Sequence, residues 1–214
     1  MIPLFVDKGK AYIWNPDDWY TIRSCHRICG SLVGAVPSFP RQNDFLGLPM
    51  ALMSEEAALL VEKGIYCQLD KEALLQEEIN KLPDLPPAHL LVHLPTEQFL
   101  NTESVKVGVD VLNPSVMEGE GAIKYAVFKD LWDRKYHITS GSKFGSDYLV
   151  YPGDPVKFHA TYMVRCVQHK TRYNTTTFVT FGRLSVAVNK IAVYAYCGTN
   201  NIEYQTFQWH DNIN

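Results

Sequence analysis

Several features that mark other protein classes are missing or scarce in this sequence. No run of about 18 apolar residues occurs, so the sequence predicts no membrane-spanning helix. The first residues, MIPLFVDKGKAYIW, hold no apolar segment of signal-peptide length, and we expect no secretory leader. Positive charge is not in excess, because the net charge is -3 and the isoelectric point is about 6.2. A surface for nucleic acid would therefore have to be local or shared with a partner.

Cysteine is also sparse, with five residues at irregular spacings: Cys25, Cys29, Cys67, Cys166 and Cys197. An odd, scattered set fits a reducing compartment better than a disulfide framework. Cys25 and Cys29 flank His26, a spacing that could suggest zinc, but no second pair of suitable spacing follows. We therefore expect neither a metal nor another cofactor.

What the chain does contain is typical of a globular α/β protein. Of its 214 residues, 46% are hydrophobic and 20% are charged. Prolines interrupt the pattern between about 82 and 120, which indicates a linker with short strands at 88–94 and 105–112. We expect two domains: a small mixed α/β domain with linker at 1–115, and a domain with a central mixed sheet flanked by helices at 116–214.

In the first half, the pattern predicts a hairpin at 3–15, a helix at 14–28, a short buried strand at 31–39 and two further helices at 54–64 and 71–82. Ser54 is the expected cap of the helix at 54–64. In the second half, the pattern predicts an amphipathic helix at 118–136, two strands around a glycine turn at 137–153, a third strand at 159–168 and a terminal hairpin at 190–209. The stretch 174–190 is ambiguous, and we interpret it as a helix followed by a strand.

One short segment, YPGDPVKFH, combines groups that can do chemistry. Tyr151 ends a predicted strand, and the turn that follows is stiffened by two prolines. His159 stands at the start of the next predicted strand, and Lys190 heads another. A phenol, an imidazole and an ammonium can transfer protons and stabilise negative charge without a metal. Each residue alone also has an ordinary explanation, as a strand-end aromatic, a structural histidine and a solvated lysine.

Together with its flanks, this segment resembles the signature of the tRNA-splicing endonuclease family. The matching stretches are SGSKFGSDYLVYPGDPVKFHATYMV and, some 30 residues later, GRLSVAVNK. The stretch VGAVPSFPRQNDFLGLPMALMSEEAALLVEKG is similar to the N-terminal domain of the family's eukaryotic catalytic subunit that cuts the 3′ splice site. The likeness covers most of the chain.

The resemblance implies a catalytic triad of Tyr151, His159 and Lys190. It also implies that Arg183 and Trp209 grip a flipped-out base of the RNA, reaching into the active site of a second catalytic subunit. An arginine and an indole can hold a base between them. The sequence departs from the family at Asn189, where a basic residue is common, which could remove a phosphate contact.

The resemblance also implies a reaction and an assembly. The RNA 2′-hydroxyl would attack the adjacent phosphorus in pre-tRNA, with His159 as general acid, Tyr151 as base or orienting group, and Lys190 stabilising the added charge. A heterotetramer with a second catalytic subunit and two structural subunits is implied, and a nuclear location would follow from that function. A non-catalytic subunit of the same complex and an unrelated metal-dependent nuclease are the alternatives. The C-terminal strands are expected to offer pairing edges to a partner.

Overall fold

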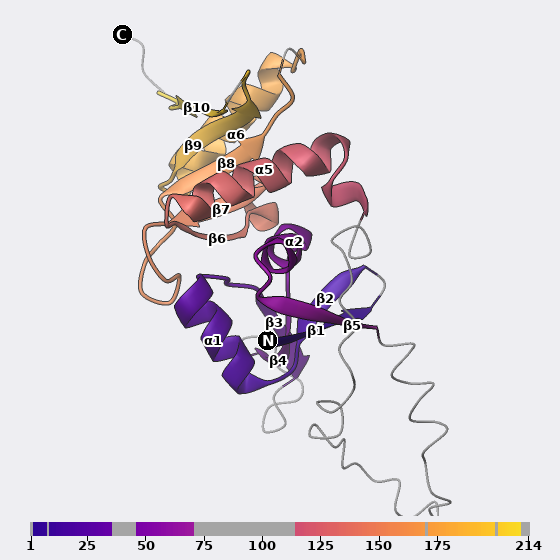
Figure 1. Cartoon of the computed structure of the whole chain (residues 1–214). Coiled ribbons are helices and arrows are strands. Elements are labelled where there is room, and N and C mark those ends of the chain that lie inside the picture. The colour runs from indigo at the N-terminus through magenta and orange to yellow at the C-terminus, as the bar shows by residue number, and fades with distance from the viewer. Residues whose placement is uncertain are drawn as a thin grey trace, which may run out of the picture. The chain divides into compact units, whose positions relative to one another are not determined.

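The computed structural model describes residues 2–7, 9–35, 46–70, 114–169, 171–199 and 201–210. The chain forms two compact units, of residues 1–20 with 31–113 and of residues 21–30 with 114–214. Figure 1 shows the elements of each unit. Each unit has its own sheet with helices, so the predicted fold class is confirmed. The predicted elements at 71–82, 88–94 and 105–112 lie outside the described residues. The predicted domain limit near 115 therefore stays a prediction.

The first unit is built on a five-stranded sheet in the order β3-β4-β2-β1-β5. Its strands are β1 (Ile2–Asp7), β2 (Lys10–Ile13), β3 (Ser31–Ala35), β4 (Leu46–Ala51) and β5 (Tyr66–Asp70). The predicted N-terminal hairpin is confirmed, because β1 pairs antiparallel with β2 around a turn at Gly9, which has a φ of 75°. β5 pairs with β1 in parallel, which makes the sheet mixed.

The described part of the first half of the chain contains two helices, α1 (Pro16–His26) and α2 (Ser54–Glu62). The Asn15 side chain caps α1 by accepting from the Asp17 N–H at 2.8 Å, and Pro16 suits the first helical position. Ser54 is not the cap of α2, contrary to expectation. The Glu56 carboxylate accepts from the Met53 N–H at 2.8 Å, so the helix begins one residue earlier than the sequence suggested.

The second unit has a five-stranded sheet in the order β10-β9-β8-β7-β6. Its strands are β6 (His137–Ser140), β7 (Tyr148–Tyr151), β8 (Tyr162–Cys166), β9 (Ile191–Cys197) and β10 (Ile202–Phe207). All neighbours are antiparallel except β8 and β9, which are parallel. The parallel pair is joined through α6 (Thr175–Ala187), so the chain crosses over the sheet between β8 and β9.

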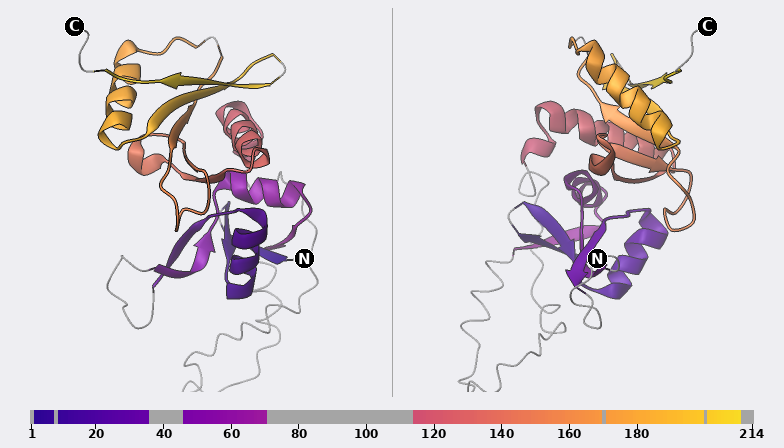
Figure 2. Two further views of the ribbon diagram at one scale, coloured as in Figure 1. Left: turned by 90° about the vertical axis from the view of Figure 1, so that its left-hand side faces the viewer. Right: turned by 180° about the vertical axis from the view of Figure 1, so that it is seen from behind.

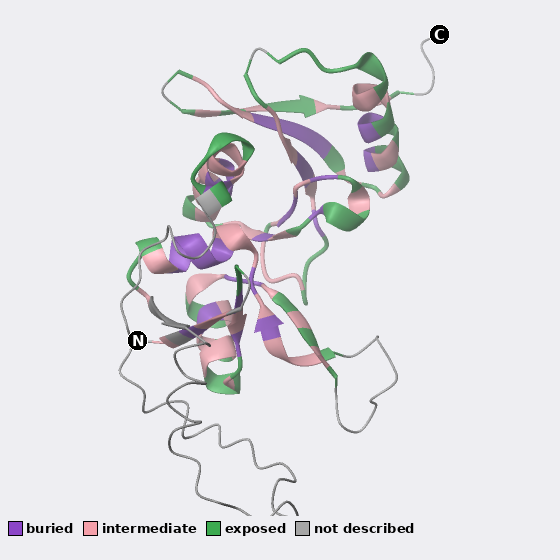
Figure 3. Ribbon diagram, turned by 90° about the vertical axis from the view of Figure 1, so that its right-hand side faces the viewer, coloured by how far each residue is buried: buried purple, intermediate pink, exposed green. Residues whose placement is uncertain are grey.

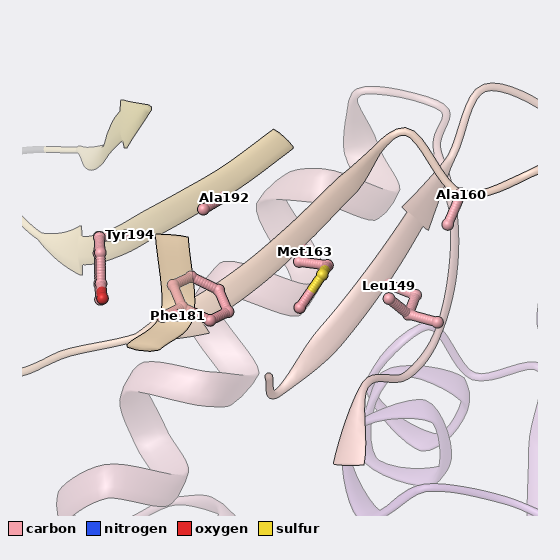
Figure 4. Packing of buried hydrophobic residues seen from close by; sticks show 6 residues of the cluster. All are labelled: Leu149, Ala160, Met163, Phe181, Ala192 and Tyr194. Atoms are coloured by element: carbon pink, nitrogen blue, oxygen red, sulfur yellow. The ribbon is translucent and has the colours of Figure 1, made fainter. Parts of the chain in front are cut away.

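The helices α5 (Gly119–Asp133) and α6 lie on opposite faces of this sheet (Figure 2). On the α6 face, Phe181 packs with a row of strand residues, and Figure 4 shows this cluster: Leu149, Ala160, Met163, Phe181, Ala192 and Tyr194. On the α5 face, the Phe128 and Tyr148 rings lie 5.7 Å apart, and the Tyr148 hydroxyl donates to the Lys124 carbonyl at 3.0 Å. Burying both faces explains why the central strands β7 and β9 are nearly all apolar.

Three details differ from the sequence-based expectations. The strand β3 is present but not buried, because it lies at the edge of its sheet, with alternating exposed and half-buried residues. The stretch 174–190 is helical as far as Ala187, and the strand starts only at Ile191. Of the two C-terminal strands, β10 is an edge strand, but β9 is central and mostly buried (Figure 3), so β9 offers no pairing edge.

A short segment from the first half of the chain belongs to the second unit. Residues 21–30 group with residues 114–214, and Ile28 forms a parallel bridge with Ile138 beside β6. The Trp132 indole N–H donates to the His26 carbonyl at 2.7 Å, and the Arg27 guanidinium donates to the Trp132 carbonyl at 3.0 Å. The end of α1 is therefore fixed to the unit that carries the candidate site.

Candidate active site

At one end of the second sheet, which we call the site end, three strand ends that are distant in the sequence lie together. β7 ends at the site end, while β8 and β9 begin there, as the pairs Val150–Tyr162 and Tyr162–Ile191 show. The Thr161 N–H donates to the Val150 carbonyl at 2.9 Å, and the Ile191 N–H donates to the Thr161 carbonyl at 2.9 Å. The sheet register therefore brings the end of β7, the chain before β8 and the chain before β9 to one place.

Tyr151 is the last residue of β7 and is half-buried. Its side chain packs against the cluster on the α6 face, which also contains Ala160, the neighbour of His159. The Thr139 hydroxyl on β6 lies 3.4 Å from the Tyr151 hydroxyl and can donate to it. The phenol is therefore held from the neighbouring strand.

His159 is exposed and lies near the end of the connection between β7 and β8. Asp154 organises this connection, because its carbonyl accepts from the N–H groups of Lys157 at 2.8 Å and Phe158 at 3.0 Å. Its carboxylate also accepts from the Val156 N–H at 2.9 Å. The Phe158 ring lies over Gly153, where a Cβ would come within 2.6 Å of it. The imidazole is thus carried on a short, internally bonded turn.

Lys190 directly follows the end of α6 and precedes β9. The Asn189 N–H donates to the Val186 carbonyl at 3.0 Å, and the Lys190 N–H donates to the Ser185 carbonyl at 2.8 Å. This pattern ends a helix through one left-handed residue, and Asn189 has a φ of 54°. The Lys190 amine lies 5.5 Å from the centre of the Phe144 ring and donates to the Val188 carbonyl at 3.1 Å.

Asn189 thus has a structural reason to differ from a basic residue. Asparagine adopts the left-handed conformation more readily than lysine or arginine does, because its short side chain can hydrogen-bond locally. The tight helix end that Asn189 permits turns the chain directly into Lys190 and β9.

Arg183 lies on α6, and Trp209 follows β10, close to Gly182, the residue before Arg183. Arg183 is exposed, and Trp209 is half-buried. A Cβ added to Gly182 would lie 2.5 Å from the Phe207 ring and 3.4 Å from the Trp209 Cβ. Glycine at this position lets the end of β10 approach the helix beside Arg183. Since Phe207 pairs with Ala192, Trp209 lies beyond the site end of the sheet, as Lys190 does.

Sequence reasoning did not find the residues that support these groups. Thr139 and Phe144 contact Tyr151 and Lys190, and Arg23 binds Asp154 through two hydrogen bonds, of 3.1 Å from Nε and 2.6 Å from a terminal nitrogen. The Arg23 bond holds the pKa of Asp154 below its usual value. No signal in the sequence indicates this pair, because 131 residues separate Arg23 from Asp154.

Two hollows of the second unit, of about 230 and 250 Å³, lie at the opposite end of the sheet. They share Tyr173, Phe178 and Tyr194 in their walls and include none of the five predicted site residues. In the part of the chain that the structure describes, no group of three or more His, Cys, Asp or Glu side chains is arranged to hold a metal ion. Nor is any described helix long and apolar enough to cross a membrane.

Comparison with known protein families assigns both parts of the chain. Residues 2–71 match the family described as TSEN34-like, N-terminal domain, and residues 122–204 match the family described as tRNA intron endonuclease, catalytic C-terminal domain. The second match contains Tyr151, His159, Arg183 and Lys190, which lie at or near the site end of the sheet. It ends before Trp209.

Some curated relatives match along nearly the whole chain, and others match a part of it. The human tRNA-splicing endonuclease subunit Sen34 is 23% identical over 98% of this chain and 99% of its own length. A probable tRNA-splicing endonuclease subunit sen34 of Schizosaccharomyces pombe is 26% identical over 94% of this chain and 88% of its own length. The tRNA-splicing endonuclease of Hyperthermus butylicus is 37% identical, over 40% of this chain and 48% of its own length.

The second unit is therefore an endonuclease catalytic domain of the tRNA-intron type, joined to a distinct N-terminal domain. The two domain matches in this order, together with relatives that align along both domains, identify the family of the chain. The chain belongs to the tRNA-splicing endonuclease family, with the domain organisation of its Sen34 subunits.

Proposed function

We propose that this chain cuts intron-containing pre-tRNA at the 3′ splice site without a metal ion. The observation that carries the proposal is that the end of β7, the segment with His159 and the start of β9 meet at the site end of the sheet, in a chain of this family. The products would be a 2′,3′-cyclic phosphate and a 5′-hydroxyl. Such a reaction needs a base, an acid and a positive charge, and no other reactant.

In the proposed reaction the 2′-oxygen forms a bond to the adjacent phosphorus, and the bond from phosphorus to the 5′-oxygen breaks. As its phenolate, Tyr151 receives the 2′-hydroxyl proton, or it orients that hydroxyl while solvent water takes the proton; the Thr139 hydroxyl holds the Tyr151 side chain in place. His159 gives a proton to the departing 5′-oxygen. Lys190 stabilises the negative charge that builds up on the phosphoryl oxygens.

Substrate grip and assembly are part of the same proposal. Arg183 is exposed and Trp209 is half-buried beside the same helix, so both can be offered to a flipped-out base. The chain is acidic overall, and we propose that other subunits bind most of the tRNA body. Its partners are a second catalytic subunit and two structural subunits, and the assembly works in the nucleus.

One assay tests the chemistry. Assembled complex is mixed with intron-containing pre-tRNA in excess EDTA, and the cut at each splice site is followed separately, with analysis of the cleaved ends. We expect 3′-site cleavage with a cyclic phosphate, reduced about 10²–10⁴-fold by His159→Ala. His169→Ala, which changes an exposed histidine outside the candidate site, is the matched control.

The alternatives give different results in this assay. Cleavage that His159→Ala leaves unchanged would assign the cut to another subunit and make this chain a structural partner. Cleavage that stops in EDTA and returns with Mg²⁺ would show a metal-dependent reaction. Loss of the 5′-site cut alone would assign the chain to the other splice site.

A further inference from the structure

The segment that carries His159 is held from outside by one side chain. Asp154 has an exposed fraction of 34% and the Arg23 side chain one of 18%, so their ion pair is partly shielded from water. Both bonds join the guanidinium to the two carboxylate oxygens, which fixes the orientation of the carboxylate as well as its position. A two-point bond of this kind restrains the segment more strongly than a single contact would.

Asp154 passes that restraint on to the rest of the segment. Its carboxylate and carbonyl accept from three successive N–H groups, at Val156, Lys157 and Phe158. His159 is the next residue. The position of the imidazole therefore depends on how Asp154 is oriented, and Asp154 is oriented by Arg23.

Arg23 is itself well anchored in the second unit. It lies on the last turns of α1, in the stretch 21–30 that groups with residues 114–214. One turn further along, Trp132 binds the His26 carbonyl, and the Arg27 guanidinium lies 4.8 Å from the centre of the Trp132 ring. These contacts fix the base of the arginine, so its guanidinium can act as a rigid support.

We propose that Arg23 is a positioning residue, which sets the place of His159 relative to Tyr151 and Lys190 through its two-point bond to Asp154. The inference rests on the proposed function, since it assumes that His159 reacts. Arg23 itself need not touch the RNA. Its loss should therefore slow the chemical step and leave substrate binding almost unchanged.

The test uses the assembled complex with full-length chain. Single-turnover cleavage at the 3′ site is measured for Arg23→Ala, Asp154→Ala and the double variant, and affinity is measured with pre-tRNA that has a 2′-deoxy residue at the cleaved bond. We expect each single change to lower the rate about 10–100-fold, as a misplacement of roughly 1 Å can do, with affinity within about twofold. The double variant should be no slower than the slower single variant, because both remove the same restraint.

Two further variants guard against loss of folding. Arg23→Lys keeps the charge but cannot form both bonds, so we expect a smaller loss than with alanine. Arg134→Ala is the matched control, because Arg134, directly after α5, also binds an aspartate, Asp130, with two nitrogens, but its side chain is 54% exposed. We expect its rate to stay within about twofold of the parent, since exposed pairs contribute little.

Several outcomes would overturn the inference. The first is an unchanged rate in Arg23→Ala and Asp154→Ala, and the second is an unchanged rate in Arg23→Lys. The third is a double variant in which the two losses multiply, and the fourth is an RNA affinity that falls in step with the rate. His159→Ala separates the two proposals. If it leaves cleavage intact, the proposed function fails; if it abolishes cleavage while Arg23→Ala does not slow it, the positioning role alone fails.

Discussion

Asn189 offers a sharp test of the structure around Lys190. Its φ of 54° places it in the left-handed region, and the two helix-ending hydrogen bonds of Asn189 and Lys190 depend on that conformation. A residue with a Cβ but no polar side chain pays a conformational cost there, and glycine does not. We therefore expect opposite effects of Asn189→Ala and Asn189→Gly.

The expected sizes follow from this conformation. Alanine in the left-handed region costs about 1–2 kcal/mol, and asparagine recovers part of that cost, so Asn189→Ala should lower the free energy of unfolding by about 1 kcal/mol. Asn189→Gly should lie within about 0.5 kcal/mol of the parent or above it, because easier left-handed geometry offsets the greater freedom of the unfolded chain. Asn189→Val should be the least stable, because a β-branched residue fits this region worst.

Urea unfolding followed by far-ultraviolet circular dichroism measures these differences. Asn201→Ala, which replaces an exposed asparagine in the β9–β10 turn, is the control and should change stability by less than about 0.5 kcal/mol. If Asn189→Gly lowers stability as much as Asn189→Ala does, the helix does not end through a left-handed residue. Lys190 would then not be placed by this helix end.

Three further predictions concern packing and pH. Gly182→Ala should lower the free energy of unfolding by about 1–3 kcal/mol in urea titration, because the Phe207 ring must move; unchanged stability would contradict the close approach. Burial lowers the pKa of His137 in the folded protein, so the unfolded chain binds a proton at this histidine at a higher pH than the folded protein does. The free energy of unfolding should therefore fall as pH drops below about 6.5, and His137→Gln should flatten that part of the stability curve. Arg23 lowers the pKa of Asp154, so this carboxyl stabilises the fold above about pH 3.8 and that contribution is lost as pH falls further; Asp154→Asn should remove it in acid unfolding.

Local chemistry made much of the fold predictable. The turn at Gly9, the cap at Asn15 and the Asn174 cap of α6 each combine a turn or cap residue with an apolar pattern. The amphipathic helix expected at 118–136 is present as α5, and it buries Val127 and Leu131. Such signals depend on neighbours within a few residues, so one sequence is enough to show them.

What failed depended on the sheet as a whole. Whether β3 is central or at an edge, and whether β9 can pair with a partner, is decided by strand order, which no short stretch encodes. At the candidate site, Tyr151, His159 and Lys190 came from a resemblance, since each residue type is common. The contacts of Thr139, Phe144 and Arg23 depend on the register of the strands and on the packing of the end of α1 within the second unit, and these arise only in three dimensions.

The attachment of residues 21–30 to the second unit has a consequence for how the protein is made. Arg23 leaves the ribosome 131 residues before Asp154. At about 5–20 residues per second, the arginine waits on the order of ten seconds for its carboxylate. For most of that interval the end of α1 lacks Trp132 and β6 as well, so a chaperone that shields this helix would act in that window.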